Sequence, residues 1–205
     1  MSVEPLLIAT RSRGKLRELR ELFRGAGLAV LDLEQAGIPV ADVEEELESA
    51  DSFEENALAK ARYFARLSQR PVIADDSGLE VMALGGRPGV RSKRWSGRSD
   101  LTGVALDEAN NAHLLRALKG LTNRRARYVC VAALVDGARE VTCRGTTEGE
   151  IIDCPRGAGG FGYDPYFFSD ELGMTFAEAT VQQKEDVSHR GRAFRSLIAV
   201  IAGQR

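Results

Sequence analysis

The sequence predicts a single α/β domain, residues 1–205, built around a mixed β-sheet with flanking helices. Short apolar runs alternate with amphipathic helical segments in its first part, which is the pattern of strands connected through helices. Asp136-Gly137 then separates two longer β-like segments, and an Asp-Gly pair favours a hairpin, so parallel and antiparallel strands share the sheet. A chain of 205 residues, 43% of them hydrophobic, can bury a full core and has room for two lobes.

The first part of the chain predicts three strands and two helices. Pro5 bounds the first apolar run, and leucines at helical spacing follow a polar turn. Ser52 forms a capping box with Glu55 ahead of an apolar stripe that ends before Pro71, which predicts a helix of about four turns. The predicted elements are strands at 6–10, 28–33 and 72–74 and helices at 16–23 and 52–67.

The second part of the chain predicts the hairpin and three further helices. A segment rich in Gly, Arg and Ser at 84–103 predicts an ordered surface excursion, and Gly120 stops the helix that follows it. The predicted elements are helices at 107–118, 181–186 and 192–202 and strands at 128–135 and 140–152.

Composition limits the classes of function. The formal net charge is -2, which excludes the basic footprint of general nucleic-acid or membrane-surface binding. No apolar run reaches the ~18 residues of a membrane span, and the N-terminus lacks the layout of a signal peptide. Cys130, Cys143 and Cys154 show no CxxC spacing and predict buried, reduced thiols. We therefore expect a soluble, cytoplasmic protein.

A glycine-rich loop matches a dinucleotide-binding fingerprint by spacing alone. Gly157, Gly159 and Gly162 fit G-x-G-x-x-G, a motif that works only when its last glycine opens a helix holding a pyrophosphate. Pro165 falls where the first turns of that helix would run, and the aromatic residues at 166–168 favour a strand. The loop therefore presents something other than a dinucleotide site.

The loop after the first predicted strand has the chemistry of a phosphate site. It reads Thr10-Arg11-Ser12-Arg13-Gly14-Lys15. Hydroxyls, a permissive glycine and a lysine ahead of a helix offer backbone N–H groups and positive charge to phosphates. It is not a Walker A loop, since the earlier glycine of that motif is missing and Leu16 replaces Ser/Thr. An ordinary basic loop is the alternative.

Carboxylates follow the third predicted strand and fill the acidic stretch. Asp75 and Asp76 end that strand with side chains on opposite faces, so one can serve the structure while the other enters a site. Mg²⁺ usually takes one or two carboxylates together with substrate phosphates, and the glutamates at 44–46 could add a second ligand. The alternatives are a simple Asp-Asp-Ser-Gly turn and a solvated acidic run.

Further donors occur in two helices. Lys60 lies one position from an apolar stripe, where most lysines extend to solvent. Lys184, His189 and Arg190 cluster near the start of the last helix, where a chain turn can aim them at oxygen acceptors of a ligand. A charged helix cap is the alternative there. The phosphate-type loop, the carboxylate pair, the glycine-rich aromatic loop and this donor cluster are together the parts of a nucleotide site.

The order of these motifs resembles the inosine triphosphate pyrophosphatase family. The specific matches are ADDSGLEV followed by ALGG and PGV, then FGYDP, then SHRG, within blocks that cover nearly the whole chain. The resemblance implies an elongated, two-lobed fold around a long mixed sheet, a nucleotide cleft between the lobes, and a homodimer. It also implies Mg²⁺-dependent cleavage of ITP, dITP and XTP to the monophosphate and pyrophosphate, which cleanses the nucleotide pool.

The resemblance also implies roles for particular residues. Asp76 would be the catalytic carboxylate and a metal ligand, Lys60 would face the phosphates, and Ser77 would touch substrate. The triphosphate would be bound by Thr10, Arg11, Ser12, Arg13, Gly14 and Lys15. The base and sugar would be surrounded by Phe161, Gly162, Tyr163, Asp164, Lys184, His189 and Arg190.

Two departures from the family pattern leave points open. Arg11-Ser12 replaces the usual Asn-Asn or Gly-Asn, so the loop either holds phosphate with added charge or makes different contacts. The acidic loop is longer than usual, which leaves the second metal carboxylate between Glu44 and Glu45. Two alternatives to the function remain, a Maf-like pyrophosphatase with another base preference and a regulatory module that binds nucleotide without catalysis.

Overall fold

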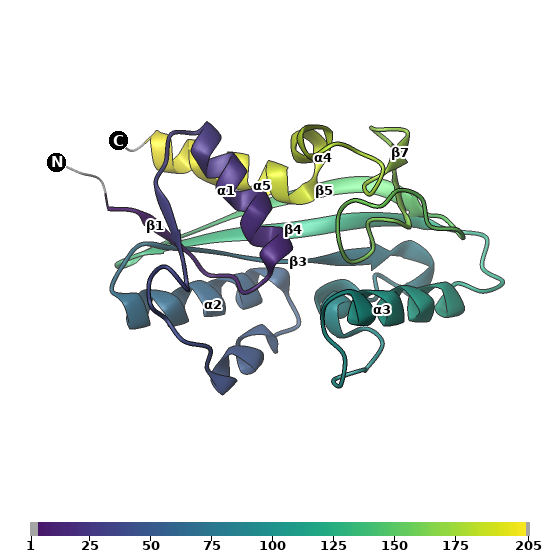
Figure 1. Ribbon diagram of the computed structural model, residues 1–205, viewed down its shortest axis with the longest axis horizontal. Coiled ribbons are helices and arrows are strands. Elements are labelled where there is room, and N and C mark those ends of the chain that lie inside the picture. Colours follow the sequence, from purple (N-terminus) through teal and green to yellow (C-terminus); the bar gives the residue numbers. More distant parts are fainter. Residues whose placement is uncertain (1–3, 204–205) are drawn as a thin grey trace. The chain divides into compact units, whose positions relative to one another are not determined.

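A seven-stranded mixed sheet organises the chain. The computed structural model describes residues 4–203, apart from the side chain at position 45. The strands, in spatial order, are β2 (Val30–Asp32), β1 (Leu6–Ile8), β3 (Val72–Val81), β4 (Arg125–Asp136), β5 (Arg139–Ile151), β6 (Phe167–Ser169) and β7 (Met174–Thr175) (Figure 1). β1 pairs in parallel with β2 and β3, whereas β6 is antiparallel to β5 and β7. The predicted mixed sheet is confirmed.

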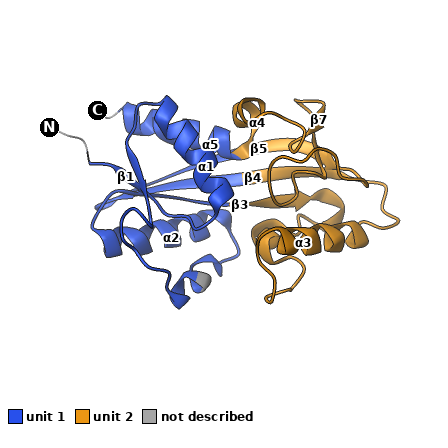
Figure 2. Cartoon of the chain, in the orientation of Figure 1, with its two compact units in different colours: residues 1–76, 130–145, 190–205 blue, residues 77–129, 146–189 orange. Residues whose placement is uncertain are grey.

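The chain divides into two compact units (Figure 2). Unit 1 comprises the chain up to Asp76, a middle segment at 130–145 and the end of the chain from Arg190, and unit 2 comprises residues 77–129 and 146–189. The long strands β3, β4 and β5 each contribute residues to both units. Two units agree with the two lobes that the family resemblance implied, while a cleft between them remains a prediction.

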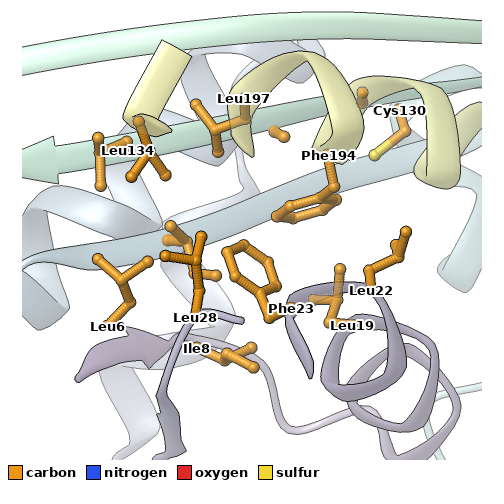
Figure 3. Close-up of a cluster of buried hydrophobic side chains, with 14 residues drawn as sticks. Leu6, Ile8, Leu19, Leu22, Phe23, Leu28, Cys130, Leu134, Phe194 and Leu197 are labelled. Atoms are coloured by element: carbon orange, nitrogen blue, oxygen red, sulfur yellow. The ribbon is translucent and has the colours of Figure 1, made fainter. Parts of the chain in front are cut away.

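Unit 1 packs its helices on both faces of its strands (Figure 1). Its helical segments are α1 (Arg13–Gly25), the 3₁₀ segment η1 (Asp42–Glu48), α2 (Phe53–Ser68) and nearly all of α5 (His189–Ala202). α1 and α5 cover one face, where Phe23 meets Phe194 edge-on at 5.9 Å between ring centroids (Figure 3). This dry cluster, which also includes β1 and β4, holds the first turn of α1 against the sheet.

The start of α1 matters for function. The helix begins at Arg13, three residues before the predicted start, because Ser12 caps it by accepting a hydrogen bond from the Lys15 N–H at 3.4 Å. Gly14 and Lys15 therefore lie in the first turn, where the backbone N–H groups have no carbonyl partner within the helix. Ser52 likewise caps α2 through the Glu55 N–H, as the capping box predicted.

Unit 2 has an aromatic core. Its helical segments are η2 (Met82–Leu84), η3 (Gly89–Arg94), α3 (Gly103–Ala117) and α4 (Val181–Val187). The Tyr128 ring stacks on Phe176 at 5.7 Å and meets Phe167 at 4.6 Å, so strand and loop segments pack through large rings. Gly162 opens no helix, since turns and then strand β6 come directly after it, which confirms that the loop does not form the dinucleotide-binding motif.

The segment after Ala74 was predicted wrongly. Asp75 and Asp76 lie inside β3, which continues to Val81 instead of turning at Ser77-Gly78. β4 neighbours β3 in the sheet, and this partner is distant in sequence, so a local pattern does not contain it. Gly78 is required by a close approach and not by a turn, since a Cβ there would lie 2.2 Å from the Gly89 carbonyl oxygen.

Other differences are smaller. α3 begins four residues before the predicted helix, and the hairpin turns at Gly137-Ala138, one residue later than predicted. Cys130 is buried and Cys143 half-buried, but Cys154 is exposed, so the prediction of buried thiols is wrong for Cys154. Among residues 4–203, no helix is both long enough and apolar enough to cross a bilayer.

Candidate active site

Unit 1 gathers six buried or half-buried charged residues, which we call the charged cluster. They come from α1, η1, α2, β3 and α5, elements that lie far apart in the sequence. The members are Lys15, Glu48, Lys60, Asp75, Asp76 and Arg190.

Asp75 holds the cations of the charged cluster. Its carboxylate is 1% exposed and lies 3.0 Å from Lys15 Nζ and 3.3 Å from Arg190 Nε, while Arg190 also binds Glu18 at 2.6 Å. Burial alone would raise the pKa of Asp75, but the positive charges of Lys15 and Arg190 outweigh it and lower that pKa well below its usual value. Asp75 is therefore an ionised anchor that positions Lys15.

Asp76 has a different environment on the other face of β3. One carboxylate oxygen accepts a hydrogen bond from Asn56 Nδ2 at 2.9 Å. Burial and the negative charge of Glu48 raise the pKa of Asp76, and they outweigh the opposing effect of Lys15 and Lys60. The two neighbouring carboxylates therefore lie in different environments, as the alternation of side chains along a strand predicts. Asp75 is paired with cations and its pKa is lowered, whereas the pKa of Asp76 is raised, as is frequent in functional sites.

Lys60 is buried, so extension to solvent does not describe it. Its ammonium group forms an ion pair with Glu48 and donates to the Asp75 carbonyl at 2.9 Å. Both contacts direct Lys60 toward the segment that carries Asp76. Sequence reasoning missed Glu48, because its partner Lys60 lies in another helical segment and the two meet only when η1 packs against α2.

Glu44 and Arg11 bind each other. Arg11 donates to both Glu44 carboxylate oxygens, at 3.0 and 2.7 Å, and to the carbonyls of Ile38 and Pro39. This hydrogen bonding lowers the pKa of Glu44. Arg11 lies in the loop after β1 and Glu44 lies in the acidic segment. Their contact therefore connects the two regions in which the sequence departs from the family pattern. The side chain of Glu45 lies outside the described residues.

The donor set of the charged cluster suits a hard cation that shares its ligands with substrate. Among the described residues, no group of three or more His, Cys, Asp or Glu side chains could hold a metal ion by itself. Asp76 and Glu48 supply two carboxylates near Lys15 and Lys60. Because Mg²⁺ keeps several waters and takes one or two carboxylates plus phosphate oxygens, these residues fit that ion.

Unit 2 contains a second group, which we call the aromatic cluster. Lys184 Nζ lies 2.6 Å from the Asp164 carboxylate, 4.9 Å from the Phe161 ring centroid and 5.5 Å from that of Phe176. Asp164 also accepts from the Phe161 N–H at 2.8 Å and from the Tyr128 hydroxyl at 3.3 Å. The buried ion pair thus fixes both the aromatic ring and the lysine beside it.

Glycines let the loop wrap around Asp164. Gly160 has φ +72°, and a Cβ there would lie 2.2 Å from the Asp164 carboxylate. Tyr163 turns inward, where its buried hydroxyl donates to the Ser92 carbonyl at 2.8 Å. The predicted base-binding loop therefore has one ring in the aromatic cluster and one in the core.

The remaining predicted residues occupy distinct positions. His189 is 4% exposed and stacks on Tyr128 at 4.5 Å, which orients its ring. Arg190, predicted beside the base, pairs with Asp75 of the charged cluster and with Glu18 of α1. Ser77 follows Asp76 in β3 and is half-buried, and Thr10 Oγ1 accepts from the Ser12 N–H at 3.2 Å. Of the predicted residues, Lys15, Lys60, Asp76 and Arg190 lie in the charged cluster and Phe161, Asp164 and Lys184 in the aromatic cluster. Arg13 is exposed at the start of α1 and belongs to neither cluster.

The comparisons with known proteins agree with the motif order. The sequence profile of the Ham1 family matches residues 6–200. The chain is 47% identical over 200 residues to the dITP/XTP pyrophosphatase of Frankia alni, covering 96% of each chain, and 46% identical over 195 residues to that of Geobacter sulfurreducens, covering 94% of each. Its fold matches a HAM1 protein from Coxiella burnetii with a TM-score of 0.84, 34% identity and coverage of 98% and 100%.

Proposed function

Because the chain belongs to the Ham1 family, we propose that it is a nucleoside triphosphate pyrophosphatase acting on ITP, dITP and XTP. The observation that carries the chemistry is the charged cluster, where buried Asp76 lies among Lys15, Lys60 and Glu48. Buried carboxylates and lysines with opposed effects on each other are a frequent signature of catalytic sites. The products are the nucleoside monophosphate and pyrophosphate.

The charged cluster handles the triphosphate in this proposal. Water attacks the α-phosphorus and a new P–O bond forms, while the proton that the water releases passes to solvent. The bridging bond to the β-phosphate breaks, and its electron pair leaves with pyrophosphate. Asp76 positions the water, while Lys15 and Lys60 neutralise the charge that develops on the phosphate oxygens. Asp76 and Glu48 would hold Mg²⁺, which when bound supplies Lewis-acid polarisation of a phosphate oxygen.

The aromatic cluster handles the base. Phe161 offers a face for stacking, since every purine has a π-face that an aromatic ring can cover. Hypoxanthine and xanthine carry an acceptor oxygen at position 6, where adenine carries an amino donor. Lys184 and His189 supply donors, so a buried donor without an acceptor penalises adenine. Arg190 is left out of this group because it pairs with Glu18 and Asp75.

One assay tests the proposal against its alternatives. Pyrophosphate release is measured with dITP, ITP, XTP, dATP and modified pyrimidine nucleotides, each with Mg²⁺ and with a chelator. The proposal expects release from the first three that depends on Mg²⁺ and exceeds release from dATP. Preference for a modified pyrimidine would favour the Maf-like alternative. Tight dITP binding without any release would favour a regulatory module.

The assembly and location follow from the family resemblance. We propose a homodimer that works in the cytoplasm, where the nucleotide pool is found. Sedimentation at micromolar concentration gives the mass in solution, and a mass of one chain would contradict the dimer. Fractionation of the cells that produce the protein tests the location.

A further inference from the structure

Two side chains of α3 bind the two backbone polar groups of one residue in the glycine loop. The Gly162 N–H donates to Asp107 Oδ2 at 2.8 Å, and the Gly162 carbonyl accepts from Asn111 Nδ2 at 2.9 Å. Residues four apart lie on one face of a helix, so α3 reaches Gly162 from a single surface. We call this arrangement the α3 clamp.

Packing does not explain the position of Gly162. Its φ is +62°, a left-handed conformation that glycine adopts easily but does not hold by itself. A Cβ added at Gly162 would meet nothing within 4 Å, so no crowding fixes the backbone there. Gly157 and Gly160, by contrast, are closely surrounded by backbone or carboxylate atoms. Two further hydrogen bonds close the turn across Gly162, from the Phe161 N–H to the Asp164 carboxylate and from the Asp164 N–H to the Phe161 carbonyl. The hydrogen bonds of the α3 clamp add the contacts that join Gly162 itself to a helix.

The two polar side chains of the α3 clamp, Asp107 and Asn111, are partly or fully removed from solvent. Asn111 is 7% exposed, and burial raises the pKa of Asp107, an effect that the Gly162 N–H opposes and the charge of Asp164 reinforces. Desolvating a carboxylate is unfavourable unless its hydrogen bonds compensate. Asp107 binds a backbone amide adjacent to Phe161, the residue whose own amide binds Asp164. Both carboxylates thus restrain consecutive amides of the same loop.

We propose that Asp107 and Asn111 are positioning residues for base selectivity. They hold Gly162, and through it they keep Phe161 and the Asp164–Lys184 pair in the arrangement that receives a 6-oxopurine. The proposal rests on the proposed function, because it concerns the base that the same site accepts. Asp107 and Asn111 bind the loop that carries Phe161, and neither belongs to the charged cluster, so the clamp would act on recognition.

The test uses Asp107→Ala and Asn111→Ala, with Glu108→Ala as the matched control. Glu108 is an exposed acid on the same helix. Full-length variants are compared by kcat and KM for dITP and dATP and by calorimetric binding of IMP without metal. Loss of a charged hydrogen bond predicts roughly a tenfold rise in the KM for dITP and a similar loss of preference over dATP. We expect little change in kcat, and the control should match the parent protein.

Asp107→Asn separates positioning from folding. It keeps an acceptor of the same shape for the Gly162 N–H, so its selectivity should fall between those of the parent and Asp107→Ala. Clamp variants that melt at a lower temperature but keep the parent's selectivity and IMP affinity would overturn the proposal. If Asp107→Ala does not fold, unchanged selectivity in Asp107→Asn and Asn111→Ala overturns it equally. A parent protein that neither cleaves dITP nor binds IMP would instead refute the proposed function.

Discussion

The charged cluster of unit 1 and the aromatic cluster of unit 2 both contain a buried aspartate paired with cations, but the surroundings of the two aspartates differ. In unit 1, Asp75 binds one cation from α1 and one from α5, so two helices meet at one carboxylate. In unit 2, Asp164 binds a single cation, Lys184, between aromatic rings. The first arrangement concentrates charge for phosphates, and the second directs one donor beside a flat hydrophobic face. In the proposed function this difference assigns chemistry to the charged cluster and recognition to the aromatic cluster, and the variants test one cluster at a time.

The largest expected effect is on turnover, from Asp76→Asn in unit 1. Removing the charge that positions water and metal should lower kcat for dITP by roughly a thousandfold, while IMP binding remains close to that of the parent. Pyrophosphate release and calorimetry measure the two quantities. Asp42→Asn, which changes an exposed acid of η1 in the same way, is the control. Near-normal turnover in Asp76→Asn would remove Asp76 from the mechanism.

A change in unit 2 should affect selectivity more than rate. Lys184→Met keeps the length of the side chain but removes the donor beside Phe161, and it leaves Asp164 without its ion pair. The preference for dITP over dATP should fall by roughly 10- to 100-fold. Kinetics on the two substrates measure the ratio. If only kcat changes, and equally for both substrates, the division between the two clusters is wrong.

The choice of metal carboxylate sharpens the account of unit 1. Glu48→Gln should raise the Mg²⁺ concentration needed for half-maximal activity by roughly tenfold, because a ligand near Asp76 loses its charge. Glu44→Gln removes only the partner of Arg11 and should shift it little. Activity is titrated against Mg²⁺ for both variants. The opposite order would return the ligand to Glu44, as the sequence alone had suggested.

The smallest expected effects are on the free energy of unfolding in metal-free buffer, whose pH dependence should differ between Asp75 and Asp76. The pKa of Asp75 is lowered on folding, so its stabilisation is present above about pH 4 and is lost as the pH falls toward that lowered pKa. The pKa of Asp76 is raised, so its ionised form costs stability at neutral pH, and this cost disappears as the pH falls through the raised pKa.

Urea unfolding between pH 3 and 8 checks both signs. Asp75→Asn should reduce the free energy of unfolding at pH 7, with a smaller difference below about pH 4. Asp76→Asn should leave that free energy unchanged or increased at pH 7. Equal losses in the two variants would show that the neighbouring carboxylates share one environment.

Local patterns predicted the elements but not all their ends. The capping box at Ser52 and the break at Pro165 were predicted correctly, because both depend on neighbouring residues. The alternative of an Asp-Asp-Ser-Gly turn is wrong, because β3 continues through Gly78, whose missing side chain admits the backbone of Gly89. Glu48 and the α3 clamp were missed for a related reason, since each acts on a residue far along the chain or across a loop.

The sequence by itself determined the family, the mixed α/β class and the identity of most residues in both clusters. Those properties follow from motif order, hydrophobic period and residue chemistry, which are written along the chain. Only the tertiary structure decided that Asp75 binds cations while burial raises the pKa of Asp76. It also decided that Arg190 pairs with Asp75 and that Arg11 and Glu44 bind each other. Burial and the distance between charges set these roles, and neither exists until distant segments pack together.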